Sequence, residues 1–335
     1  MDTGNFAAYR IDRDGERVSG QLTTMSPAQL DDGGLLVRVH YSSINYKDAL
    51  AATGAGKIIR RFPCVGGIDL AGEVVECADT RYRPGDPVIV TSYDLGVAHH
   101  GGYAEYARVP TEWAVPLPEG LTLFEAMALG TAGFTAGLGI ERMEANGLAP
   151  GNGPVIVTGA TGGVGGLTID MLTRLGYEVV ALTRKESEEA YLRGLGASAI
   201  ELVASIDLER IRPLEGARWA GAVDNVGGPI LQWVLATMKP AGTVASIGNA
   251  ASFELKTTVF PFILRGVSLL GIDSGYANHV LRERTWKRLA ADLKPAHLHE
   301  ITRTIVLDQL PTAFDDYIQG RIKGRTVVRI AADAS

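Results

Sequence analysis

The sequence predicts an α/β protein in which a small β-barrel domain is interrupted by an inserted domain with a doubly wound parallel sheet. Three observations support this fold class. Short strands separated by glycine and proline fill the first third, strands alternate with helices from Pro154, and strand-like segments return after Ser274. Alternation of apolar strands with helices is typical of a parallel sheet covered on both faces, and 335 residues are enough for two domains. We assign residues 1–124 and 273–335 to the barrel domain and residues 125–272 to the inserted domain.

The strands of the barrel domain are expected to begin with residues 35–44, which alternate as a half-buried strand does. Val37 and Val39 lie on one face of this segment, and Arg38 and His40 lie on the other. The remaining strands of this domain are expected at 71–78, 85–93, 101–110, 300–309 and 324–331.

The inserted domain is expected to contain a long apolar helix, followed by alternating strands and helices. Helices are expected at 124–143, 166–176 and 188–196, with a further helix at 280–293 beyond the sheet. Strands are expected at 154–159, 178–183, 199–203, 220–227, 242–248 and 267–273.

Composition and charge exclude several classes of protein. The net charge of -6 gives no indication of a nucleic-acid partner. Cys64 and Cys77 have no ligand-like neighbours, and two cysteines in a chain of this length indicate a reducing compartment. The segment MDTGNFAAYR lacks the apolar core of a signal peptide, and the apolar segment 125–140 is short for a membrane span. We therefore expect a cytoplasmic protein with a small-molecule substrate and with no nucleic-acid or membrane partner.

A glycine-rich segment, VTGATGGVGG at 157–166, has the properties of a phosphate-binding turn. It matches the dinucleotide fingerprint G-x-G-x-x-G if Ala160 takes the place of the first glycine. Gly162 would let the backbone approach a pyrophosphate, and Gly165 would let the following helix pack closely on the strand. Because the segment follows an expected strand and opens an expected helix, whose free N–H groups attract anions, it predicts a dinucleotide site.

The end of the second strand of this domain indicates which dinucleotide binds. An acidic residue at this place would accept hydrogen bonds from the ribose of NAD, but the chain has Thr183, Arg184 and Lys185 there. A guanidinium and an ammonium suit the 2′-phosphate of NADPH. The alternative is that Arg184 and Lys185 are solvated charges at a helix start. We expect NADPH as the cofactor.

These features together resemble the medium-chain dehydrogenase/reductase superfamily over essentially the whole chain. The matching segments are SSINYKDALA, FPCVGGIDLAGEVV, GTAGFTAG, VTGATGGVGG, TTVFPFILRGVSLLGIDS and RIKGRTVV. They are similar to the zinc-free branch of YhdH/YhfP-type quinone oxidoreductases, whose characterised members are acryloyl-CoA reductases. The resemblance implies a GroES-like β-barrel catalytic domain with an inserted Rossmann domain.

The residues at the metal-binding positions of this superfamily argue against zinc. Zinc-dependent relatives have a cysteine in the place of the INYKD segment and Gly-His-Glu in the place of GGIDLAG. Asn45, Ile68 and Asp69 do not make a Cys/His/Glu ligand set. We therefore expect no catalytic metal.

The resemblance implies that the INYKD segment lies beside the nicotinamide. It suggests that Tyr46 contacts the cofactor and donates a hydrogen bond or a proton, while Asn45 and Asp48 orient it. The alternative is that Tyr46 only packs and Asp48 only caps a turn.

Further cofactor contacts are implied by the same resemblance. It places the cofactor on Thr161, Gly162, Gly163, Val164, Gly165, Thr183, Arg184, Lys185, Asn249, Ile263 and Ser274. Relatives can carry a basic residue for the 2′-phosphate where this chain has Ala199, so the individual phosphate contacts are left open.

The segment GKIIRRFP brings three cations together. Lys57, Arg60 and Arg61 could meet the phosphates of a CoA ester. A solvated basic loop is the alternative.

The expected function is an NADPH-dependent reductase that reduces the activated C=C of a short 2-enoyl-CoA, acryloyl-CoA to propionyl-CoA. The alternatives are an NADPH:quinone oxidoreductase and a non-catalytic NADPH-binding protein. The apolar segment Val267–Ile272 is expected at the edge of the parallel sheet, where two copies of the chain could pair as a homodimer.

Overall fold

The computed structural model describes residues 4–330, and the chain divides into two compact units. Unit 1 comprises Met1–Thr131, Gly275–Lys287 and Leu298–Ser335, and unit 2 comprises Ala132–Ser274 and Arg288–His297. The start of the segment tested for a signal peptide and the end of the strand expected at 324–331 lie outside the described residues.

The segment 288–297 was assigned to the barrel domain from the sequence, but it packs with unit 2. The carboxylate of Asp170 accepts the backbone N–H groups of Ala296 and His297 at 3.0 and 2.8 Å. Asp170 is buried in a helix of unit 2, so these bonds tie the segment to that unit.

Unit 1 is built on a seven-stranded sheet in the order β15-β16-β3-β5-β6-β8, with β7 also paired to β3. A second sheet of three strands has the order β2-β1-β4. The C-terminal strands return to the first domain as expected, because β16 pairs antiparallel with β3. The strands are β1 Phe6–Asp14, β2 Arg17–Met25, β3 Leu35–Ser43, β4 Cys64–Val65, β5 Asp69–Cys77, β6 Pro87–Thr91, β7 Tyr106–Val109, β8 Ala114–Pro116, β15 Thr302–Val306 and β16 Arg325–Arg329.

The alternation expected for β3 is found only in the middle of the strand, at Val37–Val39, because Leu35 and Leu36 are both buried as well. Val37 and Val39 are in the core and Arg38 is exposed, but Ser42 and Ser43 are both fully buried at the strand end. Their hydroxyl groups are hydrogen-bonded to Asp69, which makes burial of both faces possible. The end of β3 therefore already belongs to a polar site.

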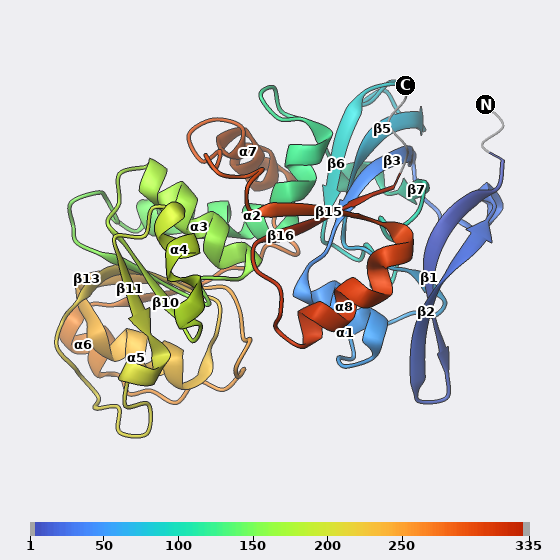
Figure 1. Ribbon diagram of the computed structural model, residues 1–335. Coiled ribbons are helices and arrows are strands. Elements are labelled where there is room, and N and C mark those ends of the chain that lie inside the picture. Colours follow the sequence, from blue (N-terminus) through green and yellow to red (C-terminus); the bar gives the residue numbers. More distant parts are fainter. Residues whose placement is uncertain (1–3, 331–335) are drawn as a thin grey trace. The chain divides into compact units, whose positions relative to one another are not determined.

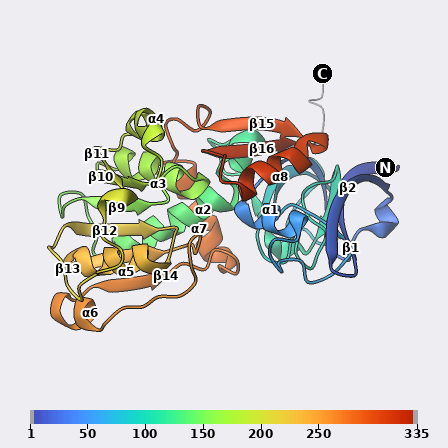
Figure 2. The ribbon, with the colours of Figure 1, turned by 60° about the horizontal axis from the view of Figure 1, so that its bottom comes forward.

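Helices α1 Tyr46–Thr53 and α8 Leu310–Ile318 lie within unit 1, while α7 His279–Leu289 begins in unit 1 and ends in unit 2. Helices α1 and α8 lie side by side in both views (Figures 1 and 2). Helix α7 ends earlier than the expected 280–293, because the chain turns so that the N–H groups of Ala291 and Leu293 both bond to the carbonyl of Arg288.

Unit 2 contains a six-stranded parallel sheet in the order β11-β10-β9-β12-β13-β14. Helices α3 and α4 lie on one side of this sheet and α5 and α6 on the other (Figures 1 and 2). This is the doubly wound arrangement, with its switch point between β9 and β12. The elements are β9 Val155–Thr158, α3 Gly163–Arg174, β10 Val179–Thr183, α4 Glu189–Gly194, β11 Ala199–Leu202, β12 Trp219–Asp224, α5 Gly228–Thr237, β13 Met238–Ser246, α6 Phe260–Arg265 and β14 Ser268–Gly271.

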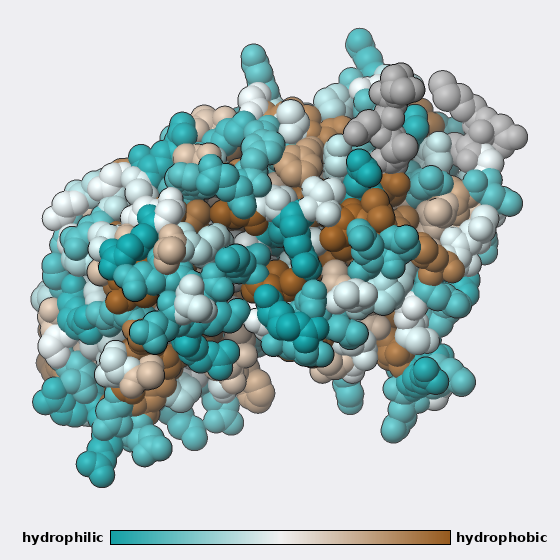
Figure 3. Space-filling model, viewed as in Figure 1, coloured by the Kyte–Doolittle hydropathy of each residue, from teal (hydrophilic) through white to brown (hydrophobic). Residues whose placement is uncertain are grey.

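The long apolar helix α2, Leu123–Ala145, is interrupted rather than continuous. Gly130 has a φ of +52° and a ψ of -155°, which is not helical. Among residues 4–330, α2 is the one helix long and apolar enough to cross a membrane, but 83% of its most apolar stretch is buried inside the protein. The face in Figure 3 is mainly hydrophilic, with hydrophobic side chains in separate patches. These observations favour a core helix over a membrane span.

Candidate active site

The glycine-rich turn of unit 2 joins β9 to the start of α3. Gly162 caps the helix, and an added Cβ there would meet only the carbonyl oxygen of Gly159, at 3.3 Å. At Gly165 a Cβ would be 2.4 Å from that oxygen and 2.8 Å from the Cα of Ala160. The backbone at Gly162 is therefore open to a ligand, whereas Gly165 permits close packing of helix and strand, as the fingerprint predicts.

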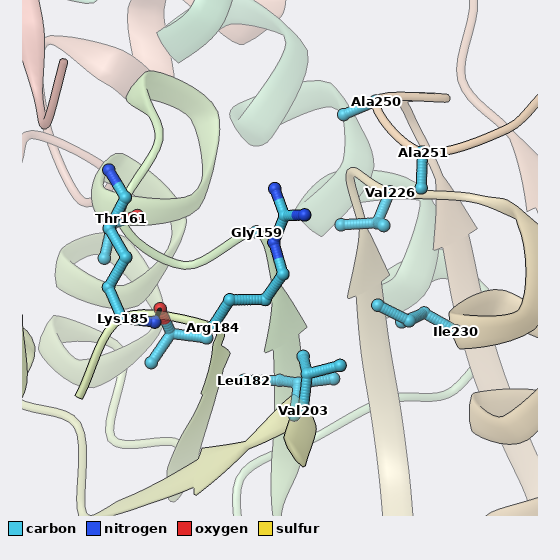
Figure 4. A pocket seen from close by; sticks show the side chains of 11 residues that line it. Gly159, Thr161, Leu182, Arg184, Lys185, Val203, Val226, Ile230, Ala250 and Ala251 are labelled. Atoms are coloured by element: carbon cyan, nitrogen blue, oxygen red, sulfur yellow. Dashed lines mark hydrogen bonds between the residues drawn. The ribbon is translucent and has the colours of Figure 1, made fainter. Parts of the chain in front are cut away.

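The ends of β9, β10 and β12 surround a pocket beside this turn (Figure 4). Arg184 and Lys185 follow directly after β10 and extend toward the glycine turn, Arg184 toward Gly159 and Lys185 toward Thr161. The complete lining is Gly159, Thr161, Leu182, Thr183, Arg184, Lys185, Val203, Val226, Ile230, Ala250 and Ala251. One wall thus carries two cations and the other is apolar, which suits a phosphate attached to a flat aromatic base.

A buried polar network holds the ends of β9 and β12 together behind the pocket. The Thr158 hydroxyl donates to the Asp224 carboxylate at 2.7 Å, and the Asn225 side chain donates to the Thr158 carbonyl at 2.8 Å. Burial raises the pKa of Asp224, while its hydrogen bonds from Thr158 and from the backbone act in the other direction. The network fixes the position from which the glycine turn leaves the sheet.

The remaining predicted cofactor residues lie elsewhere in unit 2. Asn249 is exposed and adjoins Ala250 of the pocket lining. Ser274 accepts a hydrogen bond from the Thr135 hydroxyl at 2.7 Å. Ile263 is not brought to the pocket: it is 68% exposed on α6, close in sequence to the exposed Leu264. The predicted positions of Asn249 at the nicotinamide half of the cofactor, and of Ile263 and Ser274 beside the cleft, stay predictions.

In unit 1, Asn45 and Asp48 are hydrogen-bonded to each other at the start of α1. The Oδ2 atom of Asp48 accepts the backbone N–H of Asn45 at 2.8 Å and its side-chain amide at 3.2 Å, while Oδ1 accepts the N–H of Ile68 at 3.0 Å. Burial, and secondarily the nearby Asp69 carboxylate, raise the pKa of Asp48 to about 7 against the effect of these hydrogen bonds. The protonation of Asp48 therefore changes near neutral pH.

Asp69 is the centre of this buried cluster. Its Oδ2 atom accepts hydrogen bonds from Ser43 Oγ at 2.6 Å, Asn45 Nδ2 at 2.7 Å and the Thr131 N–H at 3.0 Å. Its Oδ1 atom accepts the Thr131 hydroxyl at 2.5 Å. In the sequence, Asp69 bears only on the argument against zinc, although a carboxylate inside an apolar strand is itself an indication of a polar site.

Arg325, the first residue of β16, supplies positive charge to the same cluster. Its guanidinium is 2% exposed and donates to Ser43 Oγ at 3.0 Å, to Asn45 Oδ1 at 3.3 Å and to the carbonyl of Ala128 at 2.8 Å. Arg325 is linked to the Asp69 carboxylate through Ser43 and Asn45, and a positive charge at this place lowers the cost of burying the two carboxylates. Arg325 and Thr131 could not be predicted as site residues, because their neighbours in the fold are distant in sequence.

Tyr46 lies on the first turn of α1 and is 49% exposed. Asn45 and Asp48 are not hydrogen-bonded to its hydroxyl within the described part of the chain; they contact each other and Asp69. The expectation that these two residues orient Tyr46 stays a prediction; their mutual hydrogen bonds hold the start of α1, whose first residue is Tyr46. Asn45 and Asp48 belong to the buried carboxylate cluster, and the neighbouring Tyr46 side chain is half exposed.

The three cations expected to hold CoA phosphates differ in their surroundings. Arg60 is ion-paired with Asp94, whose Oδ1 atom also accepts the Tyr276 hydroxyl at 2.8 Å. Arg61 is ion-paired with Asp31. Lys57 is exposed. A phosphate would therefore compete with carboxylates for both arginines, and Lys57 is the better candidate for such a contact.

The raised pKa of Asp48 gives a testable pH dependence of stability. The folded state binds a proton that the unfolded state releases at lower pH, so this group's contribution is lost as pH rises from about 4 toward about 7. Asp48→Asn also replaces one of the two carboxyl oxygens by an NH2 group, so the N–H groups of Asn45 and Ile68 lose one of their two acceptor atoms. We expect Asp48→Asn to lower the free energy of unfolding at pH 5. The difference in this free energy between wild type and variant should become smaller by on the order of 1–3 kcal/mol when the pH is raised to 8. Urea denaturation at both pH values measures this change.

Asp79→Asn is a suitable control for that experiment. Hydrogen bonds from Arg81 lower the pKa of Asp79 to about 2, so this surface carboxylate is ionised at both pH values. The gap between wild type and this variant is expected to stay constant. An equal narrowing for both variants would show that Asp48 does not titrate near neutrality.

Two models of known families match the chain. The alcohol dehydrogenase GroES-like domain matches residues 31–119, and the zinc-binding dehydrogenase domain matches residues 163–293. The first match lies in unit 1, and the second covers most of unit 2. The GroES-like and Rossmann components of the predicted fold are therefore confirmed.

The residues of the buried cluster do not fit a zinc site, despite the name of the second domain. Three donors already occupy Oδ2 of Asp69 and one occupies Oδ1, and the neighbouring positions hold an asparagine amide and a guanidinium. Residues 4–330 contain no group of three or more His, Cys, Asp or Glu side chains that could hold a metal ion. A cation at this place would have to compete with Arg325.

Close relatives extend over the whole chain. YhfP of Bacillus subtilis, whose name describes a quinone oxidoreductase, is 47% identical over 97% of this chain and 99% of YhfP. The acrylyl-CoA reductase AcuI of Ruegeria pomeroyi is 45% identical over 98% of this chain and 100% of AcuI.

Solved structures agree with these relatives. The YhdH oxidoreductase from Salmonella enterica in complex with NADP has a TM-score of 0.95 at 43% identity, covering 97% of this chain and 100% of that one. The structure of YhfP with NAD bound has a TM-score of 0.96 at 46% identity and covers 98% and 100%. The chain therefore belongs to the medium-chain dehydrogenase/reductase superfamily, in the quinone oxidoreductase-like branch that contains YhfP, YhdH and AcuI.

Proposed function

We propose that this protein is a cytoplasmic, NADPH-dependent reductase that saturates the C=C bond of a short 2-enoyl-CoA, with acryloyl-CoA converted to propionyl-CoA. The observation that carries this proposal is the full-length similarity to the acrylyl-CoA reductase AcuI at 45% identity. The pocket beside the glycine turn supports NADPH as the cofactor, because Arg184 and Lys185, directly after β10, line it.

The residues of unit 2 fit NADPH. The N–H groups at the start of α3 and the open backbone at Gly162 would hold the pyrophosphate. Arg184 and Lys185 would pair with the 2′-phosphate, while Val203 and Ile230 would contact the adenine ring. Bound there, NADPH supplies the hydride for the reduction.

The residues of unit 1 would serve the substrate. An α,β-unsaturated thioester accepts hydride at its β-carbon, and negative charge develops on the thioester oxygen. Hydrogen-bond donors aimed at that oxygen lower the barrier. The exposed Tyr46 hydroxyl is the first candidate for such a donor, and Asn45 is held immobile beside it by Asp69.

The reaction is tested by following NADPH consumption with a panel of enoyl-CoA esters and quinones. Acryloyl-CoA is expected to react with a much higher kcat/KM than any simple quinone. The similarity to YhfP keeps quinone reduction as the second candidate. Efficient quinone reduction without turnover of acryloyl-CoA would refute the proposal.

The proposed contact with the CoA phosphates has its own test. Lys57→Gln is expected to raise the KM for acryloyl-CoA about tenfold and to leave kcat and any quinone activity unchanged, since one exposed phosphate contact is lost. Arg60→Gln is the matched comparison, because Arg60 is already ion-paired with Asp94. A larger effect of Arg60→Gln would move the phosphate contact to Arg60.

We propose further that two copies pair through β14, the edge strand of the unit 2 sheet. Beside it in sequence, α6 exposes Ile263 and Leu264, which are 68% and 61% exposed. A double substitution of these two residues by aspartate is expected to convert a dimer to a monomer in sedimentation velocity, because the charges would be buried in the interface. Val280→Asp, at an equally exposed aliphatic position of α7, should leave the dimer intact. A wild-type monomer at micromolar concentration would contradict the assembly.

A further inference from the structure

One segment of unit 2, residues 250–264, leads directly from the cofactor pocket to the edge of the parallel sheet. Ala250 and Ala251 belong to the pocket wall, on the side away from Lys185 (Figure 4). The chain then continues without a helix or strand to α6, and the edge strand β14 begins shortly after α6 ends. The same segment therefore borders the cofactor pocket and the surface through which two copies are proposed to pair.

Hydrogen bonds hold this segment to the end of β12 only as far as Ser252. The carbonyl of Val226 accepts the N–H of Ala251 at 2.9 Å and that of Ser252 at 3.4 Å. A Cβ on Gly227 would lie 2.2 Å from the carbonyl oxygen of Ser252, so the two backbones are in close contact there. Within the described chain, the hydrogen bonds of residues 253–258 are made inside the segment itself. The middle of the segment therefore depends on other contacts for its order.

The same stretch exposes an unusual number of large apolar side chains. Ten such side chains are exposed among residues 4–330, and six of them lie in this segment: Phe253, Leu255, Val259, Phe260, Ile263 and Leu264. Val259 and Phe260 lie one helical turn before Ile263 and Leu264, so these four share the outer face of α6. Phe262 packs against the core of the unit instead. A concentration of exposed apolar side chains marks a surface that a partner covers.

Charge and symmetry favour a second copy of this chain as that partner. In a two-fold interface each surface meets itself, so an unpaired charge would meet a like charge. The guanidinium of Arg265, the cation of α6, turns inward and donates to the carbonyls of Ala236 and Met238 at 3.0 and 2.8 Å. Lys256 and Glu254 are paired with each other at 3.7 Å. The surface is thus apolar and balanced in charge, and it continues into β14, whose open edge can pair across the same axis.

We propose that the second copy, by covering residues 253–264, orders the adjoining wall of the cofactor pocket, so that dimer assembly and NADPH binding strengthen each other. This inference rests on the proposed dimer and on the pocket as the NADPH site. NADPH requires Ala250 and Ala251 in place, and the partner requires the apolar side chains that follow them in place. Each binding event therefore reduces the conformational entropy that remains to be lost in the other. The coupling is reciprocal, and a dimer holds two pockets. A tenfold weaker affinity of the monomer for NADPH thus corresponds to a dimer that is about 100-fold tighter at saturating NADPH.

The first test measures the affinity for NADPH in the absence of any substrate. The double variant Ile263→Asp, Leu264→Asp is expected to bind NADPH about tenfold more weakly than wild type, although neither residue lines the pocket. Val280→Asp, at an exposed position of α7, is the matched control and should leave the affinity unchanged. Dilution of the wild type below its dimer dissociation constant should weaken NADPH binding by the same factor, which separates loss of the partner from a local effect of the two aspartates.

Sedimentation velocity of the wild type with and without saturating NADPH measures the coupling from the other side. The dimer dissociation constant is expected to fall about 100-fold when NADPH is added. A dimer whose dissociation constant NADPH does not change, and whose monomeric variant binds NADPH as tightly as wild type, would overturn the coupling and leave the dimer intact. A wild-type monomer would remove both. Because no enoyl-CoA is used, a protein that reduces no enoyl thioester can still show the coupling, and only the proposed activity then fails.

Amide hydrogen exchange tests whether this segment carries the coupling. Peptides that cover residues 250–260 are expected to exchange about tenfold faster in the monomeric double variant than in wild type, and NADPH should slow their exchange in both proteins. Peptides from α8 in unit 1 are the internal control and should exchange equally in all samples. Equal exchange of residues 250–260 in monomer and dimer would show that the partner does not order the pocket wall, and the proposal would fall.

Discussion

Replacement of Gly130 by alanine is expected to lower the free energy of unfolding of unit 1 by about 3 kcal/mol or more and to abolish activity. The φ of +52° with ψ of -155° is a conformation that only glycine adopts readily. A Cβ at this position would lie 2.7 Å from Asp69 Oδ2 and 2.8 Å from both Arg325 Nη2 and Ser43 Oγ. The added methyl group therefore meets the centre of the buried cluster, where each polar atom is already hydrogen-bonded.

Gly85→Ala, also in unit 1, separates the two causes of this loss. Gly85 has a φ of +91°, but a Cβ there would have no neighbour within 4 Å. Its replacement by alanine is expected to lower the free energy of unfolding only through the strained backbone, by about 1 kcal/mol. Chemical denaturation of both variants gives the comparison. An equal loss in the free energy of unfolding for both variants would mean that the side chains around Asp69 move to accommodate the added methyl group at little cost.

Neutral replacements of Arg184 and Lys185 are expected to weaken NADPH binding about 100-fold, or about 2.7 kcal/mol, and to leave NADH binding nearly unchanged. Both side chains line the pocket at the end of β10, where a 2′-phosphate would be the one group that distinguishes the two cofactors. Titration of the double variant Arg184→Gln, Lys185→Gln with each cofactor measures the two dissociation constants.

Arg193→Gln controls for the general loss of positive charge from this region. Arg193 is paired with Glu189 on the surface of α4 and is not part of the pocket. Its replacement should change neither dissociation constant. If the double variant weakens both cofactors equally, the two cations act on the shared pyrophosphate or on folding, and the 2′-phosphate assignment is wrong.

The part of the site that the sequence predicted well is local in the chain. The strand, glycine turn and helix around Gly162 and Gly165 follow one another within a few residues. The glycines at these positions permit the backbone geometry that the turn needs. The cations after β10 are likewise next to the strand that positions them. For these features the order of residues alone determines which atoms meet.

The buried cluster of unit 1 could not be found in the same way. Asp69, Thr131 and Arg325 come from three distant segments: the pairing of β16 with β3 and of β3 with β5 brings Arg325 near Asp69, and the hydrogen bonds of Thr131 join α2 to the same carboxylate. The sequence also gave no means to see that Arg60 and Arg61 meet Asp94 and Asp31. Whether a charge is free for a ligand depends on such non-local partners.

The pairing of β16 with β3 also has a consequence for biosynthesis. Strand β3 emerges from the ribosome early, but its partner is made only after the whole of Ala132–Ser274 has been synthesised. During that interval the carboxylates of Asp48 and Asp69 have no guanidinium beside them, because Arg325 is the first residue of β16. Unit 2 has most of its chain in one continuous segment and can fold first. A nascent chain that stops before Arg325 would therefore contain a folded unit 2 joined to an incomplete unit 1. In that unit 1, β3 would lack its partner strand and the two carboxylates would lack a nearby positive charge. This is the form in which quality-control proteases would encounter the truncated protein.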